Sequence, residues 1–162
     1  MSDDLENTLY LDVPAGRVEI DLLPALAPNH VARIKELARE GFYDGIVFHR
    51  VIDGFMVQTG CPQGTGMGGS GKKLKAEFNR ETHARGICSM ARSSDPNSGD
   101  SQFFIMLADN PGLDRQYTVW GRVVSGMEHV DAIKKGDSRR NGSVTDPDKI
   151  VKLQVAADAV AA

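Results

Sequence analysis

The feature that most constrains the fold is a series of short strand-like runs separated by turn residues. Apolar and polar residues alternate in the first two runs, 8–13 and 17–23, as they do in strands with one buried face. Between the runs 46–52 and 55–60 stands Asp53-Gly54, a pair typical of two-residue hairpin turns. The remaining strand-like runs are 86–91, 102–107, 117–124 and 149–157. The pattern predicts about eight short strands.

Two other segments have the spacing of amphipathic helices. In 28–40 apolar residues recur every three or four positions, with a proline at the start and a glycine just after the end. A shorter helix is expected within 127–135, and it should end before the next glycine. No strand–helix–strand alternation occurs. The order of elements therefore favours an antiparallel barrel or sandwich with helices packed on it.

Length and charge exclude several classes of protein. With 162 residues the chain is long enough for one ordinary core, so a single domain over 1–162 is expected. Its 22 acidic and 19 basic side chains are interspersed, which excludes the broad positive surface of a nucleic-acid binder. The N-terminus is acidic where a secretory signal is basic, and no apolar run is long enough to span a membrane. We expect a cytoplasmic protein.

The glycine-rich segment 60–71 contains two cofactor motifs in the wrong context. GTGMGG (64–69) matches a dinucleotide fingerprint but lacks the strand before it and the helix after it. GMGGSGKK (66–73) resembles a phosphate loop, but Lys73 replaces the hydroxyl residue that would hold magnesium. The four His are scattered, and Cys61 and Cys88 lack metal or redox spacing. We expect no cofactor or metal, and two thiols rather than a disulfide.

Arg50 is the residue whose position most needs an explanation. It interrupts an apolar strand-like run, where a cation needs water, a carboxylate or a ligand acceptor. A surface arginine on an edge strand is one explanation, because charged side chains usually stay exposed. Gln58, expected opposite Arg50 across the hairpin, and Gln102-Phe103-Phe104 on a later strand favour a second explanation, a cleft that recognises peptides.

Four segments together resemble the cyclophilin-type peptidyl-prolyl cis-trans isomerases. They are FHRVIDGFMVQTG (48–60), GTGMGGSG (64–71), SMARSSDPNSGDSQFFI (89–105) and LDRQYTVWGRVVSGMEHVD (113–131). The order and spacing of FHR, GFMVQ and SQFFI make the resemblance specific. The expected hairpin and both expected helices also fall where this family has them.

The resemblance implies both a fold and an activity. The fold is mainly β: a closed eight-stranded antiparallel barrel, capped by two α-helices, with an active groove on its outer surface. The activity is the isomerisation of X-Pro bonds in proline-containing peptides and in unfolded or flexible protein clients, by a monomeric enzyme. The alternative is a binding module or chaperone that holds proline-containing segments in the same groove without turnover.

The resemblance also assigns roles to ten residues. The family's catalytic arginine falls on Arg50, and Tyr117 stands where many members have His, keeping a ring and a polar tip. The proline pocket falls on Phe55, Met56, Phe104 and Leu113, and the groups that bind the peptide backbone fall on Gln58, Ala91, Arg92 and Gln102.

Two departures from the family pattern bear on binding. Gly112 stands where relatives carry Trp or another aromatic residue, so one wall of the pocket is missing. We therefore expect weakened binding of the macrocyclic inhibitor cyclosporin. Arg92 replaces a residue that is often Asn, and we expect this position to act mainly through its backbone.

Overall fold

The alternating N-terminal runs form a hairpin in the computed structural model, which describes residues 5–161. Strand β1 (Thr8–Val13) pairs with β2 (Gly16–Leu22), and their alternate apolar side chains are buried. The other strands are β3 (Arg50–Ile52), β4 (Met56–Thr59), β5 (Ile87–Met90), β6 (Phe103–Met106), β7 (Val119–Ser125) and β8 (Lys152–Val155). Each predicted run therefore contains a strand, although several of the strands are shorter than their runs.

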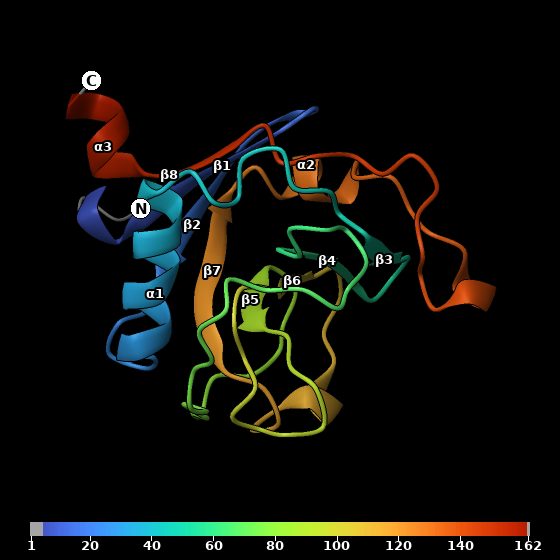
Figure 1. Ribbon diagram of the computed structural model, residues 1–162, viewed down its shortest axis with the longest axis horizontal. Coiled ribbons are helices and arrows are strands. Elements are labelled where there is room, and N and C mark those ends of the chain that lie inside the picture. Colours follow the sequence, from blue (N-terminus) through green and yellow to red (C-terminus); the bar gives the residue numbers. More distant parts are fainter. Residues whose placement is uncertain (1–4, 162) are drawn as a thin grey trace.

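The eight strands form one curled antiparallel sheet in the order β3-β4-β6-β5-β7-β2-β1-β8 (Figure 1). The expectation of a mainly β, eight-stranded antiparallel fold is confirmed. Closure is weaker than expected, because the edge strands β3 and β8 do not pair with each other. The segments that precede them meet instead at one isolated bridge between Val47 and Lys149, supported by a hydrogen bond from Phe48 N to Asp148 O (2.8 Å).

Helix α1 (Pro28–Arg39) packs against the sheet through its apolar face, where Val31, Ile34 and Leu37 are buried. Helix α2 (Met127–Asp131) is shorter than the predicted segment. A third helix, α3 (Ala156–Ala161), occupies the end of a run predicted as strand, because alanine is the strongest helix former. Single turns of 3₁₀ helix lie at η1 (Leu5–Asn7), η2 (Pro111–Leu113) and η3 (Ser138–Arg140).

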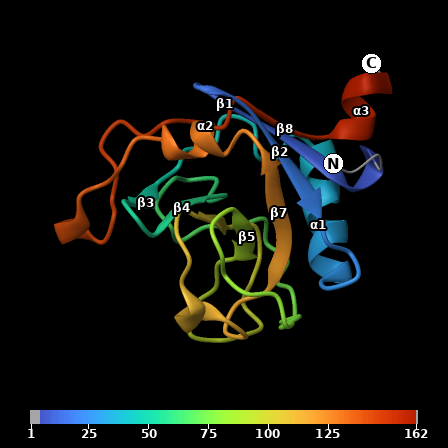
Figure 2. The same cartoon turned by 180° about the vertical axis from the view of Figure 1, so that it is seen from behind.

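The two ends of the molecule have different elements. Helices α1 and α3 lie together at one end, while β3 and the orange-red segment around η3 lie at the other (Figure 1, Figure 2). No helix among the described residues has the length and apolar character needed to cross a bilayer. Cys61 and Cys88 are buried and unpaired, as predicted.

The period of two along β6 separates two apolar clusters. Phe103 and Ile105 enter the main core, while Phe104 and Met106 join a smaller cluster on the other face of the sheet. A strict period of two along the run 46–52 predicts that Phe48 shares a face with Arg50, but this is wrong, because Phe48 lies in the main core. The reason is that regular strand geometry begins only at Arg50.

The β3–β4 hairpin sets the register on which the site depends. Arg50 pairs with Gln58, as the sequence predicted, and Ile52 pairs with Met56. Three residues therefore form the loop, with Gly54 at a left-handed φ of 73°. The predicted two-residue turn is wrong, since Phe55 belongs to the loop and joins the smaller cluster.

Candidate active site

The smaller apolar cluster borders an open groove of about 220 Å³. Nine residues line it, and all nine are among the ten that the sequence singled out: Arg50, Phe55, Met56, Gln58, Ala91, Arg92, Phe104, Leu113 and Tyr117. The tenth, Gln102, lines an adjoining pocket of about 380 Å³ that shares Gln58, Ala91 and Arg92 with the groove. The structure thus brings all ten predicted residues to one surface.

A chain of side-chain hydrogen bonds crosses this surface. Arg50 Nη1 donates to Gln58 Oε1 (3.1 Å), and Gln58 Nε2 donates to Gln102 Oε1 (3.0 Å). Gln102 Nε2 in turn donates to the carbonyl oxygens of Gly66 and Gly68, each at 2.9 Å. The glycine-rich segment therefore supplies acceptors that orient two glutamines, and no helix follows it as a nucleotide site requires.

A second set of contacts holds Arg50 from the opposite side. Its Nε donates to the backbone oxygen of Asn141 (3.0 Å), and its Nη2 donates to Asn141 Oδ1 (3.0 Å). These three acceptors of the guanidinium are neutral oxygens, and no carboxylate pairs with it among the described residues. Burial lowers the pKa of Arg50, but a guanidinium remains charged in proteins.

Aromatic and aliphatic side chains form the wall beside Arg50. Phe104 and Tyr117 pack edge to face, with ring centroids 5.4 Å apart. Leu113 reaches the wall from η2, where Asn110 Oδ1 accepts a hydrogen bond from Gly112 N (3.1 Å). The wall is therefore assembled from a strand and a capped turn that are held in fixed positions.

His83 supports this wall from behind, a role that sequence reasoning missed. The ring is buried, lies 6.2 Å from the Phe104 ring between centroids, and contacts Asp114 Oδ1 (3.1 Å) and Ser89 Oγ (3.0 Å). Burial lowers the pKa of His83, and this effect is larger than the opposite effect of the Asp114 carboxylate, which raises it. Asp114 directly follows Leu113, so His83 links the pocket turn to β5.

The Arg92 side chain lines the groove, whereas the sequence led us to expect that this position acts mainly through its backbone. Its guanidinium lies 4.8 Å from the centre of the Tyr117 ring, and its Nε donates to Gln116 O (2.9 Å). Arg92 lines both the groove and the adjoining pocket, and the preceding Ala91 N donates to Gln102 O (3.0 Å).

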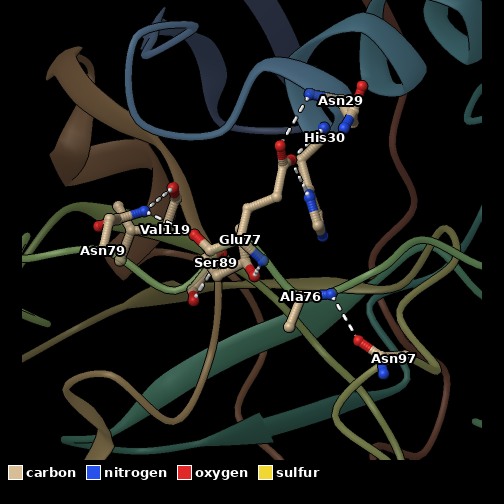
Figure 3. A network of polar contacts seen from close by, with 9 residues as sticks. Asn29, His30, Ala76, Glu77, Asn79, Ser89, Asn97 and Val119 are labelled. Carbon is tan, nitrogen blue, oxygen red and sulfur yellow. Dashed lines mark hydrogen bonds and ion pairs between the residues drawn. The ribbon is translucent and has the colours of Figure 1, made fainter.

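A polar network around Glu77 fastens the loops that flank the site (Figure 3). The Glu77 carboxylate accepts hydrogen bonds from Asn29 N (3.2 Å) and His30 N (2.8 Å), and its Oε1 lies 2.6 Å from His30 Nδ1. It therefore caps the N-terminus of α1, whose own N-cap residue has no side-chain acceptor. Ala76 N donates to Asn97 Oδ1 (2.9 Å), which ties this segment to the loop 92–101.

Lowering the pH from about 7 to about 5 is expected to reduce the free energy of unfolding. Burial holds the pKa values of His30 and His83 below their usual 6.5. Below about pH 6.5 the unfolded chain therefore binds more protons than the folded chain, and each ring removes up to about 1.4 kcal/mol per pH unit. Urea unfolding at both pH values checks this, and a midpoint that does not fall at the lower pH would contradict it.

Similarity to known proteins shows the family to which the chain belongs. The family model of the cyclophilin-type peptidyl-prolyl cis-trans isomerases matches residues 8–155. A probable peptidyl-prolyl cis-trans isomerase from Brucella suis is 53% identical over 167 residues, covering 96% of this chain and 85% of that protein. Peptidyl-prolyl cis-trans isomerase B from Bacillus subtilis is 47% identical over 130 residues, covering 79% of this chain and 90% of that protein.

Solved structures show the same fold. The cyclophilin AquaCyp293 from Hirschia baltica superposes with a TM-score of 0.86 at 30% identity, covering 98% of this chain and 77% of that chain. A cyclophilin-type isomerase from Cryptosporidium parvum, crystallised in the presence of the dipeptide Ala-Pro, gives 0.83 at 27% identity, with coverage of 91% and 98%. The chain belongs to the family of cyclophilin-type peptidyl-prolyl cis-trans isomerases.

Proposed function

We propose that this isomerase accelerates X-Pro rotation by stabilising a twisted amide with Arg50, without a covalent intermediate. Rotation about a peptide bond costs about 18–20 kcal/mol, because the nitrogen lone pair is delocalised into the carbonyl. In the twisted state the prolyl nitrogen recovers this lone pair and becomes a better hydrogen-bond acceptor. A donor aimed at the nitrogen therefore binds the transition state more tightly than the planar ground state.

The observation that carries this proposal is that the Arg50 guanidinium has more hydrogen-bond donors than it has protein acceptors. It has five N–H donors, and three of them have protein acceptors in the structure. Two donors thus remain for a substrate at the edge of an apolar groove. The three protein contacts fix the orientation of the plane, which Lys, a flexible point charge, would not achieve.

The apolar wall has a separate role in the proposal. Met56 and Phe104 are buried and Leu113 is half-buried, so together they offer a proline ring a surface that excludes water. With the ring held, the carbonyl before the proline is the part that rotates. The same wall lowers the local dielectric around Arg50, which strengthens its hydrogen bond to the amide.

The proposed substrates are proline-containing segments of unfolded or flexible chains. The Cryptosporidium parvum relative was crystallised in the presence of Ala-Pro, which supports a proline-containing ligand for this groove as well. The open shape of the groove and of the adjoining pocket suits an extended chain that continues on both sides of the proline.

The test is the rate of cis-to-trans isomerisation of a proline tetrapeptide near 10 °C, where the uncatalysed reaction takes minutes. We expect catalytic amounts of the protein to accelerate it. Binding of the peptide without acceleration would contradict turnover and would favour the alternative of a binding module or chaperone. The unused donors of Arg50 favour the enzyme, because a module that only holds proline does not need them.

Replacing Gly112 by Trp is expected to tighten cyclosporin binding by about tenfold. A Cβ at Gly112 would meet only Asn110 Oδ1, at 3.2 Å, so the turn accepts a side chain once the Asn110 side chain shifts by a few tenths of an ångström. The added ring would extend the apolar wall beside Leu113, and tenfold corresponds to about 1.4 kcal/mol, less than full burial of an aromatic ring provides. Calorimetric titration measures the change.

Val151→Trp is the matched control, because Val151 is exposed and does not line the groove. Its cyclosporin affinity should equal that of the wild type. An unchanged affinity in Gly112→Trp would mean that the missing ring does not limit binding.

A further inference from the structure

We propose that Asn141 is a positioning residue for the isomerisation, because it orients the Arg50 guanidinium toward the groove. The inference rests on the catalytic role proposed for Arg50. Asn141 lies 91 positions along the chain from Arg50, yet both of its oxygens accept hydrogen bonds from that side chain, each at 3.0 Å. These bonds involve Nε and Nη2, whereas the bond to Gln58 involves Nη1.

The three contacts together fix the plane of the guanidinium. Two donors on one edge are held by a single residue, and one donor on the other terminal nitrogen is held by Gln58. With Gln58 alone, the side chain could rotate about that single hydrogen bond. The paired contact with Asn141 removes this freedom, so the two remaining donors point in a fixed direction.

Backbone contacts fasten Asn141 to the strand that carries Arg50. Gly142 O accepts a hydrogen bond from Val51 N (2.8 Å), and Gly136 N donates to Val51 O (2.9 Å). The segment 136–143 thus lies along the free edge of β3, at the end of the molecule opposite to α1 (Figure 1). Arg50 and Asn141 therefore move together with the same strand.

Asparagine suits position 141 in two ways, through the backbone conformation that it tolerates and through its neutral side chain beside the Arg50 cation. Asn141 has a left-handed φ of 58°, a conformation in which Asn is tolerated much better than most other side chains. Its amide oxygen is neutral, so it orients the cation without cancelling its charge. A carboxylate at this position would orient Arg50 and weaken its field at the substrate amide.

Asn141→Gly is the informative variant, since it removes Oδ1 and leaves the left-handed backbone unstrained. We expect kcat to fall about tenfold, the effect of losing one hydrogen bond to a charged group, and the peptide Kd to change less than about twofold. Exchange NMR measures the rate on bound peptide, and titration measures the affinity separately.

Asp146→Gly is the matched control. Asp146 also has a left-handed φ, of 50°, and it lies in the same connection between α2 and β8, but no side-chain contact links it to Arg50. This variant should retain the wild-type kcat. A wild-type kcat in Asn141→Gly, or an equal loss in both variants, would overturn the positioning role.

A double-mutant cycle separates positioning from general structural support. In the Arg50→Lys background, which is expected to keep a measurable rate, Asn141→Gly should cause clearly less than a tenfold loss, because the planar fork that it orients is absent. A further tenfold loss in that background would overturn the inference. Failure of the proposed function is a different result, in which Arg50→Ala itself retains the wild-type rate.

Discussion

Arg50→Ala is expected to lower kcat by about a thousandfold, to near the uncatalysed rate. Going from about 0.01 per second to a typical turnover of about 10 per second requires a factor of that size, or about 4 kcal/mol. In the proposed mechanism most of this stabilisation comes from a charge-assisted hydrogen bond of Arg50 to the twisted amide. The tetrapeptide assay measures the loss.

Two further variants define what the Arg50 result means. Arg50→Lys keeps a positive charge but loses the planar fork held by Gln58 and Asn141, so we expect a rate between those of wild type and Arg50→Ala. Arg122→Ala removes an exposed arginine of β7 that does not line the groove, and it should leave the rate unchanged.

Loss of fold must be separated from loss of catalysis. Arg50 is half-buried and hydrogen-bonded to strand β4 and to the segment 136–143, so Arg50→Ala also removes structural contacts. A thermal midpoint well above the assay temperature, together with retained peptide binding, would show that the groove persists. Near wild-type turnover in Arg50→Ala would overturn the mechanism.

The sequence predicted the strands and their facing residues well, because both depend on local alternation. The facing of Arg50 and Gln58 was predicted correctly, but a two-residue turn at Asp53-Gly54 would pair Arg50 with Val57, and it is the three-residue loop that gives the observed register. Phe104 is similar, since period two along β6 separates it from Phe103. Such features need only neighbouring residues.

The contacts that complete the site could not be predicted, because they join segments that only the sheet brings together. Asn141 stands in an Asn-Gly pair, which is typical of an ordinary turn, and its contact with Arg50 depends on how the segment 136–143 lies along β3. His83 was one of four scattered histidines until the fold placed it behind Phe104. No local pattern encodes either contact.

The glycine-rich segment is an intermediate case. A glycine-rich composition is typical of left-handed turns, which the structure contains at Gly60, Gly64, Gly66 and Gly71. The sequence could not show which of these glycines also lacks room for a side chain. Whether a glycine has room for a Cβ depends on how closely another segment approaches it.

Gly60→Ala is expected to destabilise the protein by about 2–5 kcal/mol, the sum of backbone strain and steric conflict. Gly60 has a φ of 98°, and a Cβ there would lie 2.3 Å from Ser101 O and 2.8 Å from the Cα of Gln102. The Ser101 carbonyl cannot withdraw freely, because the buried Tyr43 hydroxyl donates to it (2.9 Å). Moving it would leave a buried donor unsatisfied.

Gly45→Ala measures the backbone strain alone, so its difference from Gly60→Ala gives the steric part of the effect. Gly45 has a similar φ of 81°, but nothing lies within 4 Å of the position that a Cβ would occupy, so only the left-handed strain of about 1–2 kcal/mol applies. The free energies of unfolding of the two variants, measured in urea, should therefore differ by about 1–3 kcal/mol. Because Gln102 follows Ser101 and bonds Gln58, folded Gly60→Ala should also lose activity, whereas Gly45→Ala should not. Equal destabilisation by the two substitutions would show that the close approach of the chain at Gly60 is not what requires glycine.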